Sequence, residues 1–141
     1  MNEPLLRCET ELTIPFFDVD SIEIVWHGHY AKYFEMARCE LLDKLGYNYV
    51  DMKASGYAWP VVDMRIKYVK PLHFQQRIHI ISELVEHENR LKIDYRIEDA
   101  NTGEKLSVAY TIQVAVNMAE KTMCYASPKA LLDKIEALKN A

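Results

Sequence analysis

Three kinds of reactive group come together in a short stretch near the N-terminus. Asp18 and Asp20 follow a short apolar segment, and His27 and His29 flank a glycine a few positions further on. A carboxylate can attack a carbonyl carbon or take a proton from water. The first backbone N–H groups of a helix can polarise a carbonyl oxygen on which negative charge develops. A hydrolase site is therefore one interpretation of the stretch, in which Asp20 could reach a carbonyl group held at a helix start near His27.

From the residues alone, plainer interpretations of the same side chains stay open. An aspartate between a strand and a helix commonly forms a turn or caps the helix. His27 can equally be a hydrogen-bonded structural histidine. Two histidines around one glycine do not make a zinc site, so we expect no metal.

A long amphipathic helix follows these residues. From His29 to Leu45 apolar side chains recur at helical spacing, and Gly46 follows as a stop signal. Such an apolar stripe needs a large surface to pack on. Four later segments have strand-like patterns that supply one: residues 61–68, 77–85, 91–97 and 106–116.

The order of these elements predicts an α+β fold. Residues 6–14 alternate and end at Pro15, which predicts a first strand near a sheet edge. The connections between the later strands are too short for a parallel crossover, so we expect antiparallel hairpins. Ser127 and Pro128 predict the N-cap and first turn of a closing helix. We expect an antiparallel five-stranded sheet wrapped around the long helix, with a C-terminal helix.

Length, charge and cysteine content narrow the functional class. The 141 residues match one domain, 1–141, and the net charge of −4 without a basic cluster argues against nucleic-acid binding. The chain has neither the pattern of a signal peptide nor an apolar run that could span a membrane, so we expect no membrane partner. Three cysteines without CxxC spacing fit reduced thiols. We expect a cytoplasmic protein.

A composite pattern extends from the two acids to the strand at residues 61–68. It consists of Asp18-Val-Asp20, Val25-Trp26-His27, Tyr30, Phe34-Glu35 and Ala37-Arg38, then Val61-Val62, Met64, Ile66, Tyr68 and Pro71. This pattern resembles the acyl-CoA thioesterases related to 4-hydroxybenzoyl-CoA thioesterase, within the hotdog superfamily. The resemblance implies that Asp20 is the catalytic carboxylate and that the His27 N–H polarises the thioester carbonyl. It also implies a homodimer, or a homotetramer, with sites at the subunit interface.

The loop after Asp20 departs from that family. Many members have a small residue and one or two glycines there, whereas this chain has Ser21-Ile22-Glu23-Ile24. The bulkier loop could give the acyl pocket a different shape from that of other family members. Glu23 could influence the ionisation of Asp20, or could be a solvated loop charge.

Further residues are candidates for binding the substrate, an acyl-CoA or acyl-carrier-protein thioester. Tyr57 and Trp59 could line an acyl tunnel or simply pack, and Tyr30 suits the core or the pocket wall. Glu35 could face a partner subunit or pair with Arg38, and the ion pair is the favoured interpretation. Basic residues of the 61–68 strand and the loop after it could meet the CoA phosphates or could lie on a solvated sheet face: Arg65, Lys67 and Lys70.

Two other functions remain open at this stage. Hydratases and dehydratases of acyl thioesters on the same fold pair a histidine with an acid, which His27 with Asp20 or Glu35 could imitate. A non-catalytic acyl-binding module is the second alternative. Hydrolysis is favoured, and it needs no cofactor because a thioester is already an activated acyl group.

Overall fold

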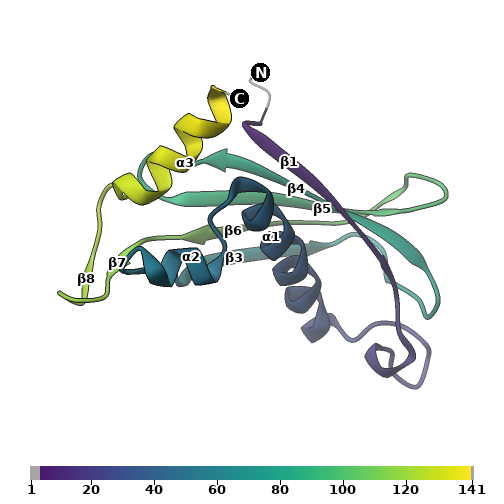
Figure 1. The fold of residues 1–141 in the computed structure, drawn as a ribbon. Helices are drawn as coiled ribbons and strands as arrows, with labels where there is room; N and C mark the ends of the chain where they lie inside the picture. The colour runs from purple at the N-terminus through teal and green to yellow at the C-terminus, as the bar shows by residue number, and fades with distance from the viewer. Residues whose placement is uncertain (1–3, 141) are drawn as a thin grey trace.

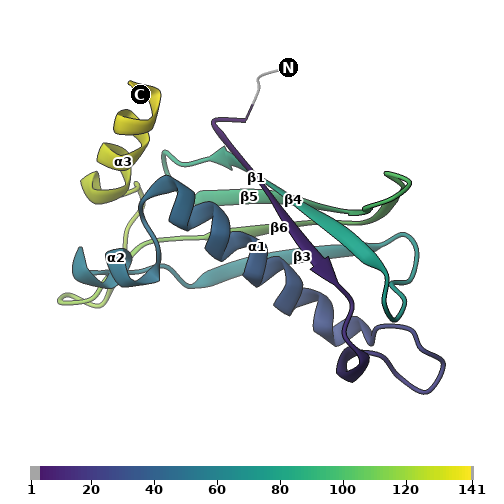
Figure 2. The ribbon, with the colours of Figure 1, turned by 45° about the vertical axis from the view of Figure 1, so that its right-hand side comes forward.

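A curved antiparallel sheet and one long helix form most of the molecule. The computed structural model describes residues 4–140. The sheet has the strand order β1-β4-β5-β6-β3, and α1 lies across its inner face (Figures 1 and 2). These elements are β1 (Leu6–Thr13), α1 (Tyr30–Leu45), β3 (Val61–Tyr68), β4 (Arg77–Glu86), β5 (Leu91–Asp99) and β6 (Lys105–Gln113). The α+β architecture, the five strands and their antiparallel pairing were all predicted and are confirmed.

Alternation along the strands explains why one sheet face is covered and the other is wet. In β5 the residues Leu91, Ile93 and Ile97 are fully buried against the helix side, while Lys92 and Asp94 between them point the other way. The period of two that a strand imposes therefore sorts apolar from charged side chains. The inner face of the sheet and α1 together enclose the core.

The long helix has the bounds that its apolar spacing predicts. Eight of its residues are buried, among them Tyr33, Phe34 and Ala37, and its polar residues other than Arg38 lie on the opposite side. Gly46 ends the helix in the left-handed conformation, with φ of 83°. A residue without a Cβ adopts this conformation readily, so the stop signal has a direct physical cause.

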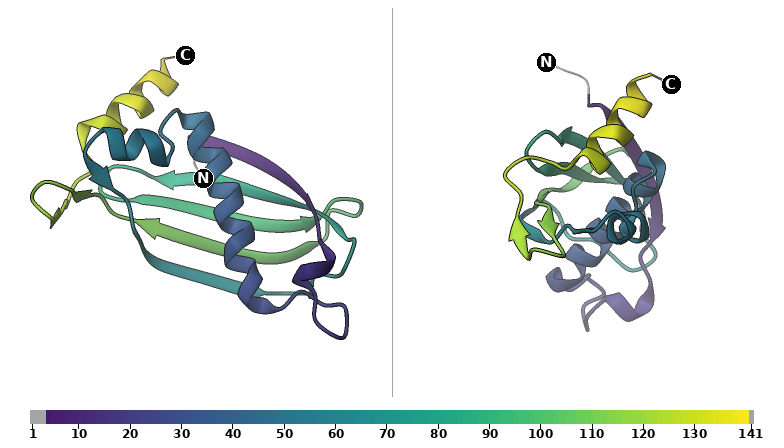
Figure 3. Two further views of the ribbon diagram at one scale, coloured as in Figure 1. Left: turned by 60° about the horizontal axis from the view of Figure 1, so that its bottom comes forward. Right: turned by 60° about the vertical axis from the view of Figure 1, so that its left-hand side comes forward.

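A short helix and a small second sheet lie at one end of the molecule and were not predicted. They are α2 (Tyr49–Ala54) and the strands β2 (Tyr57–Ala58), β7 (Val116–Asn117) and β8 (Thr122–Met123). Asn48 and Asp51 form a capping box that starts α2. That pair of residues is a sequence signal that could have revealed the helix. Figure 3 places these elements at the opposite end of the sheet from the loop that precedes α1.

The closing helix, α3 (Lys129–Lys139), is confirmed, but its predicted cap is wrong. Pro128 occupies the N-cap position, and the Ser127 hydroxyl instead donates to the carbonyl of His87. The serine thus ties the start of α3 to the connection between β4 and β5. Within residues 4–140, none of the helices is long and apolar enough to cross a bilayer.

Candidate functional site

Asp20 lies in an exposed loop that leads into α1. Its Oδ1 accepts hydrogen bonds from the N–H of Ile22 at 2.9 Å and of Ile24 at 3.4 Å. Its own N–H donates to the carbonyl of Ile24 at 2.9 Å. One carboxylate oxygen therefore fixes the loop, as the turn-forming interpretation expects. The other oxygen, Oδ2, accepts no hydrogen bond from the described part of the chain and is available to a reacting group.

Glu23 occupies a backbone conformation that normally favours glycine. Its φ is 62°. The conformation is held by two backbone hydrogen bonds, from the Glu23 N–H to the Asp20 carbonyl and from the Phe74 N–H to the Glu23 carbonyl. The backbone of the loop thus forms the turn for which glycine is normally used, and the Glu23 side chain adds an exposed carboxylate at its tip.

Asp18 has a different environment from Asp20. It is only 2% exposed, and its carboxylate accepts hydrogen bonds from Lys32 Nζ at 2.7 Å and from the Tyr33 hydroxyl at 2.6 Å. His29 Nδ1 lies 3.9 Å from the same group. Burial alone would raise the pKa of Asp18, but the hydrogen bonds from Lys32 and Tyr33 outweigh it and lower the pKa. Asp18 is thus a charged anchor that joins the loop to the first turns of α1.

The helix start is held from three sides. The Trp26 N–H donates to the Asp18 carbonyl at 3.3 Å, and the short turn from His27 to His29 continues directly into α1. The Tyr68 hydroxyl, at the end of β3, donates to the His27 carbonyl at 3.2 Å. The N–H groups of His29 and Tyr30 donate to the carbonyls of Trp26 and His27, whereas those of His27 and Gly28 have no acceptor within residues 4–140 and can meet a substrate oxygen.

Gly28 is required by the tryptophan beside it. A Cβ on Gly28 would lie 2.3 Å from Cζ3 of the Trp26 ring, which covers this part of the backbone. The Trp26 side chain is nevertheless 55% exposed, and its ring lies within 5.4 Å of the His29 ring. An aromatic surface therefore borders the helix start.

His27 and Tyr30 lie at the same end of the molecule as Asp20. The His27 side chain is exposed and its ring packs edge-on to Tyr68. Tyr30 is buried, and its ring lies 4.7 Å from that of Tyr68. Burial raises the pKa of Tyr30, which suits a packing residue rather than an acid catalyst.

Tyr57 and Trp59 line an apolar groove at the other end of the sheet. The groove has a volume of about 500 Å³ and lies between α2 and the small sheet. Its walls are Tyr49, Met52, Lys53, Tyr57, Ala58, Trp59, Pro60, Val116 and Met118. The eight residues of β3 separate it from the helix start, which corresponds to roughly 23 Å at the rise of a strand. One chain alone therefore does not bring Asp20 and the apolar groove together.

The expected ion pair between Glu35 and Arg38 is wrong. Arg38 is 7% exposed, and its Nε donates to the Tyr49 hydroxyl at 2.7 Å. Glu35 lies on the exposed face of α1, where it borders a shallow groove with Met36 and Cys39. The two residues are three positions apart on the helix, yet Arg38 turns inward and Glu35 outward. The spacing in the sequence shows that Glu35 and Arg38 are neighbours on the helix, but it does not show that one faces outward and the other inward.

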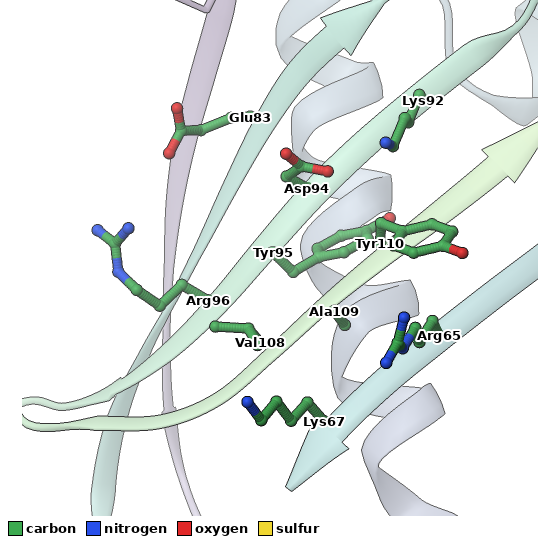
Figure 4. Close-up of a pocket in the computed structure, with 10 residues that line it drawn as sticks. All are labelled: Arg65, Lys67, Glu83, Lys92, Asp94, Tyr95, Arg96, Val108, Ala109 and Tyr110. Carbon is green, nitrogen blue, oxygen red and sulfur yellow. The ribbon is translucent and has the colours of Figure 1, made fainter. Parts of the chain in front are cut away.

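The basic residues considered for binding the CoA phosphates do not form one cluster. They are Arg65, Lys67 and Lys70. Lys70 forms an ion pair with Glu104 at 2.7 Å. Arg65 and Lys67 border a groove of about 500 Å³ on the outer face of the sheet, together with cations and anions of neighbouring strands (Figure 4). Those neighbours include Lys92, Arg96, Glu83 and Asp94. The outer face therefore carries charges of both signs around this groove.

Within residues 4–140, no group of three or more His, Cys, Asp or Glu side chains is arranged to hold a metal ion. The reactive groups near Asp20 are instead one exposed carboxylate and the N-terminal end of a helix.

Comparison with known proteins identifies the family of this arrangement. The profile of the thioesterase-like superfamily matches residues 14–136, from the end of β1 into α3. The chain belongs to this superfamily. YneP of Bacillus subtilis (strain 168), provisionally named an acyl-CoA thioesterase, is 33% identical over 101 residues, which are 72% of this chain and 72% of YneP.

Solved structures of this superfamily agree with the fold. Slr0204 of Synechocystis, a 1,4-dihydroxy-2-naphthoyl-CoA thioesterase, superposes with a TM-score of 0.82 at 20% identity, over 94% of this chain and 98% of that one. The DHNA-CoA thioesterase of Staphylococcus aureus gives a TM-score of 0.78 at 24% identity, over 95% and 93%. The predicted hotdog fold of this superfamily member is thereby confirmed.

Proposed function

We propose that the protein hydrolyses acyl-CoA thioesters to a free acid and CoA, with Asp20 as the reacting carboxylate. The observation that carries the proposal is an exposed carboxylate with one oxygen fixed by its loop, on the segment that leads into the start of α1. Membership of the thioesterase-like superfamily and the likeness to YneP support the reaction class.

The chemistry that we propose uses Asp20, near the start of this loop, and the backbone N–H groups near His27, at its end. The thioester oxygen meets the backbone N–H groups at the helix start near His27, which stabilise negative charge as the carbonyl carbon becomes tetrahedral. Asp20 Oδ2 either attacks that carbon or takes a proton from an attacking water. The carbon–sulfur bond then breaks, and the CoA thiolate leaves and is protonated by solvent. Direct attack would form a mixed anhydride that water hydrolyses in a second step.

We further propose that the complete site forms between two copies of the chain. β3 is an edge strand, and Val61 and Val62 on it are exposed. At the other edge, β1, Lys44 Nζ donates to the Arg7 carbonyl and so occupies one of the backbone groups that a further strand would need. Antiparallel pairing of two β3 strands about a two-fold axis would set the Val61 end of one strand against the Tyr68 end of the other.

This pairing would bring Asp20 and an apolar groove together, which a single chain does not do. The apolar groove beside the partner's Trp59 would then lie next to the helix start of the first copy, where Asp20 is. Glu35, exposed on α1, would face the same interface. A thioester could thus place its carbonyl at Asp20 and its acyl group in the groove of the partner.

The proposal is tested by thiol release from a panel of aromatic and aliphatic acyl-CoA substrates. Asp20→Asn keeps a side-chain oxygen that can accept the Ile22 N–H, so the loop should persist while the reacting carboxylate is lost. We expect kcat to fall at least about a hundredfold. Glu23→Gln, in the same loop, is the matched control and should retain activity.

Two results would contradict this function. One is hydration of an enoyl-CoA by the wild-type protein without thiol release, which would indicate a hydratase. The other is unchanged thiol release in Asp20→Asn, which would place the activity elsewhere or assign it to a contaminant.

A further inference from the structure

Arg38 carries a buried positive charge that no acid neutralises directly. It projects from α1 into the interior, and no carboxylate of residues 4–140 lies within the 4.0 Å of an ion pair. Burial by itself would lower the pKa of Arg38, but the hydroxyls of Tyr95 and Tyr49 more than offset this. A buried guanidinium held mainly by phenol oxygens is unusual, because such a charge is normally paired with an acid.

The hydrogen bond between Arg38 and Tyr49 leaves one proton unused. Arginine can only donate, so in the 2.7 Å contact the Tyr49 oxygen is the acceptor. The phenolic proton of Tyr49 must therefore point away from Arg38. Tyr49 lines the apolar groove, and within residues 4–140 its hydroxyl donates to no acceptor, so the proton lacks a partner in the protein. A donor whose oxygen already accepts from a cation is polarised and forms a stronger hydrogen bond.

The rest of the groove around Tyr49 offers mainly apolar contact. Met52, Ala58, Pro60, Val116 and Met118 supply most of its surface. A polarised donor in such surroundings binds an acceptor strongly and is penalised when an apolar group covers it, because the donor then loses its water and gains no partner.

We propose that the Tyr49 hydroxyl, backed by Arg38, determines substrate specificity by selecting acyl groups with a hydrogen-bond acceptor at the end remote from the thioester. The acceptor is a hydroxyl or, with the uncompensated charge of Arg38 behind the tyrosine, a carboxylate. This inference rests on the proposed function, in which the groove receives the acyl group.

The test compares substrates that differ by one polar group, in the wild type and in Tyr49→Phe. The pairs are benzoyl-CoA with 4-hydroxybenzoyl-CoA, and hexanoyl-CoA with adipoyl-CoA. We expect Tyr49→Phe to lower kcat/KM for the acceptor-bearing member by about tenfold to a hundredfold. For the plain member, kcat/KM should not fall and should rise where the apolar group would have covered the unpaired hydroxyl, and retained activity also shows that the variant is folded. Tyr125→Phe, which removes a hydroxyl from an exposed tyrosine outside the groove, is the matched control.

The same comparison in an Asp20→Asn background separates recognition from hydrolysis. There the Kd of each CoA thioester is measured by calorimetry, and Tyr49→Phe should weaken only the acceptor-bearing member of a pair. Equal losses for both members would mean that Tyr49 only packs and would overturn the inference. Absence of thiol release from every substrate by the wild type, with this pattern of Kd values intact, would contradict the proposed hydrolysis and leave the specificity inference supported.

Discussion

At the scale of single residues, the two acids of the Asp18-Val-Asp20 sequence illustrate how position decides role. They are two positions apart, yet one is an inaccessible anchor with three partners and the other is an exposed carboxylate with a free oxygen. A turn that binds one oxygen of Asp20 leaves the other to react. Turn formation and reactivity are therefore compatible in the same side chain.

The anchoring role of Asp18 predicts a specific dependence of stability on pH. Its pKa is lowered in the folded protein, so its ionised form contributes stability above the unfolded value of 3.8. That contribution is lost as the pH falls below 3.8 and through the folded pKa. We expect Asp18→Asn to lower the free energy of unfolding at neutral pH and to flatten its decline in acid. Urea unfolding between pH 7 and pH 2.5 measures both, and an unchanged acid slope would contradict the assignment.

The strained backbone at Glu23 predicts that glycine would be more stable there. A left-handed residue with a Cβ costs roughly 1–2 kcal/mol, and glycine gives back about 0.5–1 kcal/mol through its freer unfolded chain. We expect Glu23→Gly to raise the free energy of unfolding by about 0.5–1 kcal/mol, measured by urea denaturation. Glu23→Ala, which keeps a Cβ, is the control, and a loss of stability in Glu23→Gly would show that the carboxylate makes a contact of its own.

At the scale of elements, regular patterns were predictable and local exceptions were not. The helix from Tyr30 to Leu45 and the strand from Val61 to Tyr68 follow from periods of 3.6 and 2, so their bounds could be read from the sequence. The two-residue strands of the small sheet have no period to detect. Ser127 has the composition of a cap, but its hydroxyl is bound by a distant carbonyl. Tertiary contacts of this kind are invisible to local reasoning.

In the candidate site, too, some features were predictable from the sequence and others were not. The positions of Asp20 and the helix start near His27 follow from the order of loop and helix. The inward turn of Arg38 could not be foreseen, because its partner Tyr49 belongs to the unpredicted α2. The distance between Asp20 and Trp59 depends on how β3 runs across the sheet, which the spacing of residues along the chain does not reveal.

The open edge at β3 predicts that a charge there would separate two subunits. Val62 is 56% exposed on this edge, and in the proposed antiparallel pairing a lysine in its place would lie near Lys67 of the other copy, so two like charges would repel. We expect Val62→Lys to shift the protein from dimer to monomer in analytical ultracentrifugation and to lower thiol release in parallel. Val85→Lys places the same charge on the exposed side of β4, away from the edge, and should change neither. Loss of activity in a Val62→Lys protein that is still dimeric would contradict the explanation.

At the scale of the whole molecule, the fold separates the carboxylate from the groove by the length of the sheet. The loop that precedes α1 lies at one end, and α2 with the small sheet lies at the other (Figure 3). A two-fold axis across β3 would place the Asp20 end of one copy beside the groove end of the other. Activity would then depend on assembly. The proposed site would then contain residues of two chains.

The composite site is tested most directly by complementation between two inactive variants. Asp20→Asn keeps an intact groove, and Met118→Asp, which puts a charge on an exposed wall of the groove, keeps an intact carboxylate, so each variant alone should release little thiol from acyl-CoA. Mixing and refolding them in equal amounts should restore about a quarter of wild-type activity, since half of the dimers are mixed and each mixed dimer has one complete site. Mixtures that stay as inactive as the separate variants would show that Asp20 and the groove serve the same chain, and would contradict the composite site.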